Sequence, residues 1–269
     1  MKRTALVLAA HGSRHEPAVN AQVRAWADAI AARALFDDVV VAFEQGNPPF
    51  SAVLDQLTAT EATVVPVMTS VGYYSDTVLP RELARNRRYA EIVLHRTAPL
   101  GTHASLVDII ADRVQALYSR FALSADQTSL AVVGHGTPRH TRSRDATRDL
   151  AAWLRRMRIA DEVVAAFLDD APPVDSILKR VGRSNVVVAP FLIGVGPHAV
   201  RDIPRRIGLV VSEGGEPPFS GRVGGRFVVC DAPVGSDPRI VDLIVELALG
   251  RALEGSGPAE RPVVHAEAL

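Results

Sequence analysis

The chain has 269 residues, enough for two lobes of about 120 residues that each have a hydrophobic core of their own. Lysine plus arginine and aspartate plus glutamate both number 30, so no basic field indicates a nucleic-acid partner and no acidic excess indicates disorder. The single cysteine, Cys230, excludes an internal disulfide and a site built from several thiolates, and we expect a cytoplasmic protein.

Strands and helices alternate along the first half of the chain. The apolar run at 4–10 predicts a buried strand, because His11 and Gly12 end it before it could span a membrane or act as an export signal. Apolar residues at helical spacing follow over 17–34. Similar patterns predict strands at 39–43, 62–68 and 91–94, with helices at 50–57, 80–88 and 103–117. Such alternation indicates parallel strands joined by right-handed crossovers.

The second half of the chain repeats this plan. His11 and His135 are 124 residues apart, and glycines, prolines and aromatic residues recur at this spacing as far as Arg81 and Arg205. The second set of strands is predicted near 129–134, 162–167, 185–191 and 226–229. After Arg205 the spacing grows by about ten residues, which places an insertion in the Gly-rich stretch 212–225. We interpret the pattern as an internal duplication.

The duplication predicts the domain organisation. We expect an N-terminal lobe at 1–118, a linker at 119–128 and a C-terminal lobe at 129–252. The remaining residues, 253–269, have little periodicity and are predicted to form a tail.

Candidate functional side chains follow the predicted strands at their carboxyl ends, where parallel sheets bind ligands. His11 and His135 follow the first strand of each half, Glu44 follows the second strand of the first half, and Tyr74 and His198 follow the third strands. Imidazoles with a carboxylate and no thiolate suit cobalt, nickel, iron or zinc better than calcium or magnesium. Histidine, with an ordinary pKa of about 6.5, can also accept a proton near neutral pH.

These residues resemble the sirohydrochlorin chelatases, the class II cobalt or iron chelatases of cobalamin and siroheme synthesis. The resemblance covers residues 4–250 and rests on Leu-Ala-Ala-His11-Gly-Ser-Arg, Phe43-Glu44, the segment from Gly196 to Pro204, and the Pro-Leu-Gly and Pro-Val-Gly turns. It implies an α/β fold of two tandem flavodoxin-like lobes, each with a parallel four-stranded sheet, around a tetrapyrrole cleft. It also implies insertion of a divalent metal into sirohydrochlorin without ATP. The metal, Co²⁺, Fe²⁺ or Ni²⁺, is then a substrate, and no organic cofactor is expected.

A chelatase must hold a metal loosely, accept two pyrrole protons and orient a polycarboxylate ring. The resemblance implies that His135, His198 and His11 are catalytic and that these three and Glu44 bind the metal. Tyr74 is expected to contact the substrate. Arginines beside the motif loops are expected to bind its carboxylates, because a guanidinium pairs with a carboxylate through two hydrogen bonds. These arginines are Arg14, Arg139, Arg201 and Arg205.

The chain departs from the family pattern of histidine, glutamate and histidine within one lobe. The first half has Tyr74 in the third place, and the second half has Leu168 in the place of the carboxylate. Asp169 or Asp170 could supply that carboxylate, or a working site could combine groups from both halves.

Other functions remain open at this level. The split set of ligands allows a non-catalytic protein that stores or carries a tetrapyrrole or a metal. A histidine phosphatase would require Arg-His-Gly, whereas Ala10 and Gly134 precede the two histidines, and the Gly-x-Ser-x-Gly motif of serine hydrolases is absent. We expect no nucleic-acid or membrane partner, and a chain with both lobes could act as a monomer or a homodimer.

Overall fold

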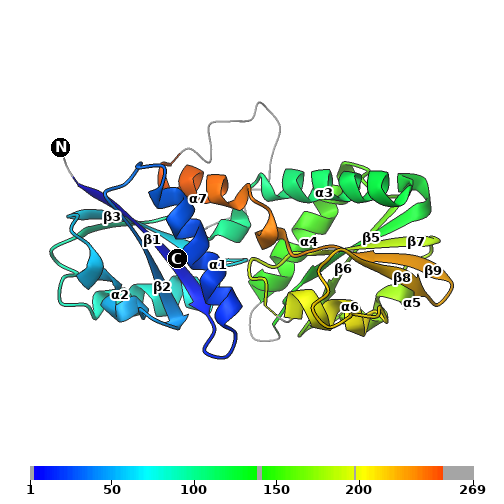
Figure 1. Cartoon of the computed structure of the whole chain (residues 1–269), viewed down its shortest axis with the longest axis horizontal. Helices are drawn as coiled ribbons and strands as arrows, with labels where there is room; N and C mark the ends of the chain where they lie inside the picture. The colour runs from blue at the N-terminus through cyan, green and yellow to red at the C-terminus, as the bar shows by residue number, and fades with distance from the viewer. Residues whose placement is uncertain (1–2, 138–140, 197, 251–269) are drawn as a thin grey trace. The chain divides into compact units, whose positions relative to one another are not determined.

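The computed structural model describes residues 3–137, 141–196 and 198–250, except the side chain of His198. Within these ranges the chain forms two compact units (Figure 1). Unit 1 runs to His103 and also takes in the residues from Pro238 onward, and unit 2 is Ala104–Asp237.

Unit 1 contains a parallel sheet of four strands in the order β2-β1-β3-β4. These strands are β1 (Thr4–Gly12), β2 (Asp38–Gln45), β3 (Glu61–Val67) and β4 (Val93–Arg96). Its helical segments are α1 (Pro17–Ala31), η1 (Phe50–Gln56), η2 (Tyr74–Val78), α2 (Leu79–Ala84), η3 (Leu100–Thr102) and α7 (Ile240–Ala248). Residues 5–10 of β1 are all buried, which is the expected burial of a central strand covered on both faces.

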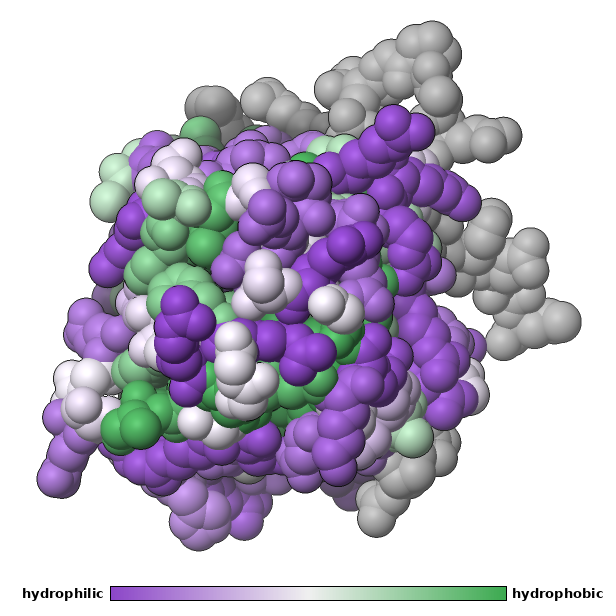
Figure 2. Space-filling view, turned by 90° about the vertical axis from the view of Figure 1, so that its right-hand side faces the viewer, coloured by the Kyte–Doolittle hydropathy of each residue, from purple (hydrophilic) through white to green (hydrophobic). Residues whose placement is uncertain are grey.

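Unit 2 contains a sheet of five strands in the order β6-β5-β7-β9-β8. They are β5 (Thr128–Gly134), β6 (Glu162–Phe167), β7 (Asn185–Pro190), β8 (Phe219–Val223) and β9 (Arg226–Cys230). Helical segments are α3 (Leu106–Phe121), η4 (Ala125–Gln127), α4 (Thr141–Arg156), η5 (Val174–Ser176), α5 (Ile177–Arg180), η6 (His198–Asp202), α6 (Ile203–Arg206) and η7 (Val234–Ser236). On the face shown in Figure 2, hydrophilic residues surround smaller apolar areas.

The fold confirms two α/β lobes, with one addition to the expected four strands in the second. The predicted insertion at 212–225 contains β8, which pairs antiparallel with β9 and extends the sheet. The sequence did not predict this strand because its residues alternate between buried and exposed and include polar residues and glycine, so they form no continuous apolar run.

The duplication also holds in the detailed geometry. Ala10 pairs with Phe43 in unit 1, and the residues 124 positions later, Gly134 and Phe167, pair in unit 2. The π-helical segments η2 and η6 begin at Tyr74 and His198, which have the same spacing. Both units therefore share this pairing and this helical start, although β1 pairs with β2 as far as Gly12 and Gln45 while β5 and β6 stop pairing at Gly134 and Phe167.

Each unit contains one helix that comes, in sequence, after the last strand of the other unit's sheet. Helix α3 follows β4 in sequence but packs against α4 and β7 in unit 2, and α7 follows β9 but packs against α1 and β3 in unit 1. The compact units thus differ from the expected ranges 1–118 and 129–252. Amphipathic spacing shows that a helix has a buried face, and it does not show which sheet that face covers.

The expected linker at 119–128 is ordered: it contains the end of α3, all of η4 and the first residue of β5. The expected tail at 253–269 lies outside the described residues. No helix in the described ranges is both long and apolar enough to cross a membrane.

Candidate functional site

Unit 1 brings three of the predicted residues together. His11 lies near the end of β1, Glu44 lies on β2, and Tyr74 begins η2. The Nδ1 atom of His11 is 3.5 Å from Oε2 of Glu44, and the His11 and Tyr74 rings meet edge to face with centroids 4.6 Å apart. The Glu44 Oε2 atom is buried and accepts no hydrogen bond within the described residues, so its contact with His11 is one of proximity at 3.5 Å.

Glycine shapes the loop after each strand-end histidine. Gly12 and Gly136 both have a φ of +69°, in the left-handed region that glycine enters without a steric penalty. A Cβ at Gly12 would lie 2.8 Å from Cδ1 of Phe43, and one at Gly136 would lie 2.9 Å from Cβ of Phe167. The chain therefore turns tightly against a buried phenylalanine, and His11 and His135 remain exposed.

In unit 2, His135 also faces a carboxylate. Its Nδ1 atom lies 3.4 Å from Oδ2 of Asp169 and 3.0 Å from the carbonyl oxygen of Gly136. A carbonyl oxygen only accepts hydrogen bonds, so this contact favours the tautomer with the proton on Nδ1 and a lone pair on Nε2. Asp169 thus stands where the duplication places Gln45, one position beyond the buried Leu168.

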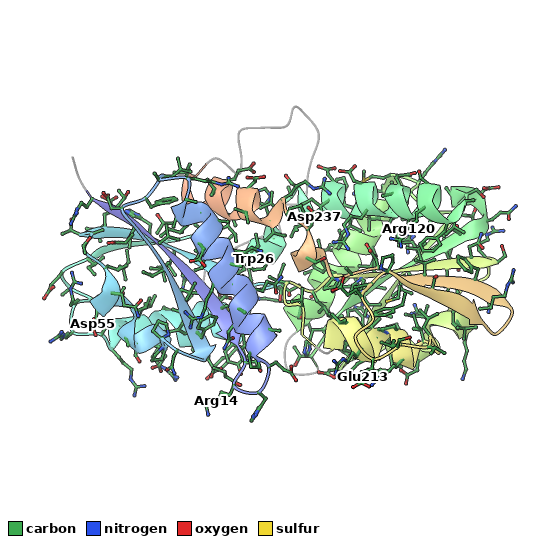
Figure 3. The ribbon with its side chains drawn as sticks, in the orientation of Figure 1. Arg14, Trp26, Asp55, Arg120, Glu213 and Asp237 are labelled. Carbon is green, nitrogen blue, oxygen red and sulfur yellow. The ribbon has the colours of Figure 1, made fainter. Side chains whose placement is uncertain are left out.

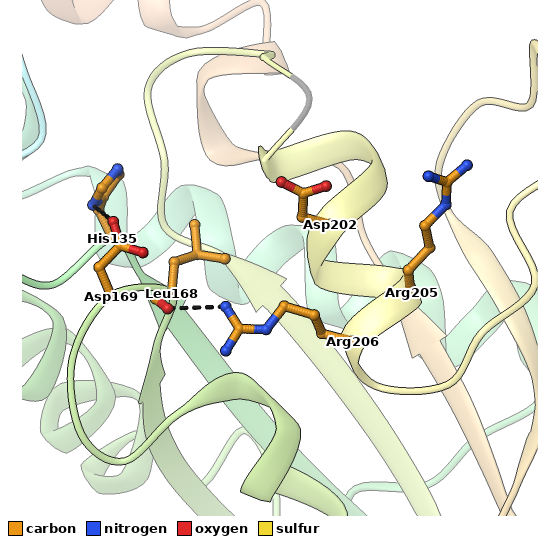
Figure 4. A pocket seen from close by; sticks show the side chains of 6 residues that line it. All are labelled: His135, Leu168, Asp169, Asp202, Arg205 and Arg206. Carbon is orange, nitrogen blue, oxygen red and sulfur yellow. Dashed lines mark hydrogen bonds and ion pairs between the residues drawn. The ribbon is translucent and has the colours of Figure 1, made fainter.

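A hollow of about 350 Å³ opens beside His135. Its lining consists of His135, Leu168, Asp169, Asp202, Arg205 and Arg206 (Figure 4). Figure 4 shows His135 and Asp169 close together and Asp202 on the segment that leads into α6. The hollow offers imidazole, carboxylate and guanidinium groups to one ligand.

Four residues of this lining were not predicted as site residues: Leu168, Asp169, Asp202 and Arg206. The sequence indicates Asp169 only as a possible substitute for the missing carboxylate, and it assigns no role to Asp202. Arg206 donates from Nη1 to the carbonyl oxygen of Leu168 at 2.9 Å and from Nε to Oδ1 of Asp175 at 2.6 Å. The duplication gave no signal for Arg206, because residue 82, its counterpart, is a glutamate.

The structure gives fewer contacts for the remaining predicted residues. Arg14 projects from the loop after β1 (Figure 3), and Arg201 is an exposed residue of η6. Arg139 and the side chain of His198 lie outside the described residues. Among the residues that are described, no three His, Cys, Asp or Glu side chains group closely enough to hold a metal ion.

Comparison with known sequences gives matches along both halves. The CbiX family model matches residues 5–117 and 129–249. A probable sirohydrochlorin cobaltochelatase of Halobacterium salinarum is 31% identical over 264 residues, which cover 91% of this chain and 90% of that protein. A sirohydrochlorin cobaltochelatase of Methanococcus maripaludis is 27% identical over 142 residues, covering 45% of this chain and 98% of that protein.

Solved structures share the fold. SirB from Bacillus subtilis with Fe³⁺ aligns with a TM-score of 0.72 at 19% identity and covers 93% of this chain and 96% of its own. CbiX, described as the terminal enzyme for siroheme biosynthesis in denitrifying bacteria, aligns with a TM-score of 0.68 at 20% identity and covers 94% and 100%. At these identities the likeness establishes the two-lobed fold.

Proposed function

This chain belongs to the CbiX family, and we propose that it is a metal chelatase that inserts a divalent metal ion into sirohydrochlorin or a closely related tetrapyrrole. Family membership is supported by the match of both halves and by the 31% identity to the Halobacterium salinarum protein. We further propose Co²⁺ or Fe²⁺ as the metal and cobalamin or siroheme biosynthesis as the pathway. The names of the curated relatives favour cobalt.

The observation that carries the chemistry is the same in each unit: a carboxylate faces Nδ1 of the histidine that follows the first strand. The distances are 3.5 Å from His11 to Glu44 and 3.4 Å from His135 to Asp169. A carboxylate on one ring nitrogen orients the imidazole and increases the basicity of the other. Nε2 of each histidine is therefore the atom that we assign to the metal substrate or to a pyrrole proton.

The reaction exchanges two pyrrole protons for one M²⁺, and no ATP is required for that balance. We assign proton acceptance and transient metal binding to His11, His135 and His198, with Glu44 beside His11. Loose binding suits a site that must release its metal to the macrocycle.

The substrate is a polycarboxylate, and arginines surround the proposed sites. Arg205 lines the hollow beside His135, while Arg14 and Arg201 are exposed near the strand-end loops. We assign these three and Arg139 to the substrate carboxylates, because a planar guanidinium binds a carboxylate through two parallel hydrogen bonds. Tyr74, which contacts His11, is assigned to the tetrapyrrole ring.

The test is an optical assay with metal-free sirohydrochlorin and the wild-type protein, in which Co²⁺, Fe²⁺ and Ni²⁺ are supplied in turn. We expect the absorbance bands of the metallated ring to appear faster than without protein, and fastest with Co²⁺ or Fe²⁺. The same donor atoms accept all three metals, so the rates must decide among them. Equal rates with and without protein would contradict the proposal.

The alternative is a non-catalytic protein that binds a tetrapyrrole or a metal. It is favoured by Tyr74 and Leu168, which occupy places where the family pattern has a histidine and a glutamate. Such a protein would bind sirohydrochlorin in a fixed ratio to chains, and metal would enter the ring at the rate measured without protein.

A further inference from the structure

A side chain of helix α1 binds the backbone of the loop that follows His11. Asn20, in the first part of α1, accepts a hydrogen bond on Oδ1 from the backbone N–H of Ser13 at 2.9 Å. It also donates from Nδ2 to the carbonyl oxygen of Ser13, again at 2.9 Å. Both backbone groups of the residue two positions after His11 are thus fixed by one amide.

Space for this amide comes from two glycines. A Cβ on Gly46, in the loop after β2, would lie 3.0 Å from Nδ2 of Asn20. A Cβ on Gly12 would lie 2.9 Å from Oδ1 of Asn20. Asn20 therefore fills the gap between the loop after β1 and the loop after β2, directly beyond the strand ends that carry His11 and Glu44.

Unit 2 has an ion pair at the two equivalent positions. The residues 124 positions after Asn20 and Gly46 are Arg144 and Asp170. Nη1 of Arg144 lies 3.5 Å from Oδ2 of Asp170, with side-chain exposures of 28% and 10%. A Cβ on Gly136 would lie 2.7 Å from Cβ of Asp170, so Asp170 packs directly under the loop that follows His135.

Oδ1 of Asp170 accepts a hydrogen bond from the Ala171 N–H at 2.7 Å, but one other atom of each partner is unsatisfied. Oδ2 of Asp170 and Nε of Arg144 are both buried, and neither makes a hydrogen bond within the described residues. A contact of 3.5 Å constrains geometry less than two amide hydrogen bonds of 2.9 Å. The duplication has therefore placed an ion pair at the two positions where unit 1 has the amide and the glycine.

We infer that Asn20 is a positioning residue that orders the His11 loop. A side chain held in its working orientation before substrate arrives loses less freedom on binding. The role of Asn20 in turnover rests on the proposed function, whereas its role in ordering the loop does not.

The experiment compares the variant Asn20→Ala with the variant Asn86→Ala, which is the matched control. Asn86 is also in unit 1 and also uses both ends of its amide, donating to the Ser51 carbonyl oxygen and accepting from the Arg88 N–H, both at 2.8 Å. It joins the end of α2 to η1 and is not placed in the site. Both variants are expected to lower the melting temperature.

Only Asn20→Ala is expected to change the histidine loop. Amide exchange at Ser13 should become at least about tenfold faster, and the ¹⁵N signals of the His11 ring should shift toward a mixture of tautomers. If the protein is a chelatase, kcat should also fall by about tenfold, as is usual for a residue that orients a ligand. Unchanged Ser13 exchange and His11 ring signals, or equal changes in Asn86→Ala, would overturn the inference whether or not metal insertion is observed.

Discussion

The substitution Glu44→Gln tests whether the carboxylate beside His11 serves function more than stability. The two side chains are 45% and 27% exposed, and their contact is 3.5 Å long. Ion pairs as exposed as this one stabilise a protein by less than about 1 kcal/mol, so we expect little change in the free energy of unfolding. Loss of a carboxylate that orients an imidazole typically lowers metal affinity or activity about tenfold or more, which corresponds to about 1.4 kcal/mol in the barrier.

A second histidine–carboxylate pair in unit 1 supplies the matched control. Glu61 and His95 lie 3.0 Å apart with exposures of 26% and 57%, but this pair joins β3 to β4 away from the strand-end loops. Initial rates of metal insertion and chemical denaturation should be measured for Glu44→Gln and Glu61→Gln in parallel. We expect only Glu44→Gln to lower the rate. Equal rates in the two variants and the wild type would refute the reasoning.

Further predictions concern the second unit and the stability of both units. His135→Ala should lower the initial rate of metal insertion by at least about a hundredfold, as expected for loss of a proton acceptor, whereas Tyr74→Phe should change it only slightly. A wild-type rate in His135→Ala would instead place metal insertion in unit 1. Arg113 of α3 lies 2.8 Å from the Asp231 carboxylate, which is 12% exposed. Arg113→Met should therefore lower the free energy of unfolding by about 3 kcal/mol in denaturant titration, and a loss below about 1 kcal/mol would contradict this. Burial lowers the pKa of His103 from 6.5, although the Glu246 carboxylate opposes this, so the folded protein favours the neutral ring. The neutral His103 ring therefore contributes its full stability above about pH 6.5, and this stability is lost as the pH falls. His103→Gln should weaken the acid sensitivity of the melting temperature.

Much of the fold could be predicted from the sequence because buried parallel strands are recognised there as continuous apolar runs. The central strands β1 and β5 are buried almost throughout, and both were predicted close to their observed limits. The spacing of 124 residues then predicted the second lobe from the first. Strand β8 was missed because an edge strand with one buried residue among polar ones has no such run.

Long-range packing could not be predicted in the same way. The exchange of α3 and α7 depends on which sheet each apolar helix face covers, and no local pattern carries that information. In α3, Arg113 anchors the helix to Asp231, a residue 118 positions later in the chain. Such a contact becomes visible only when the fold is known.

The candidate site was predicted in part. His11, Glu44 and Tyr74 lie together as their positions at strand ends had indicated. The carboxylate beside His135 is shifted by one residue, from the duplicated position at Leu168 to Asp169, because Leu168 turns into the core. Arg206 was missed because it reaches the site through a backbone carbonyl, a contact that residue type and spacing do not reveal.

The number of turnovers per chain tests the central claim most directly. A small amount of wild-type protein is mixed with excess metal-free sirohydrochlorin and Co²⁺ in the absence of ATP, and the metallated ring is counted by its absorbance. We predict many product molecules per chain at a rate well above that without protein. Product formation that stops at one ring per chain, or that proceeds only at the rate without protein, would contradict a chelatase and identify a binding protein instead.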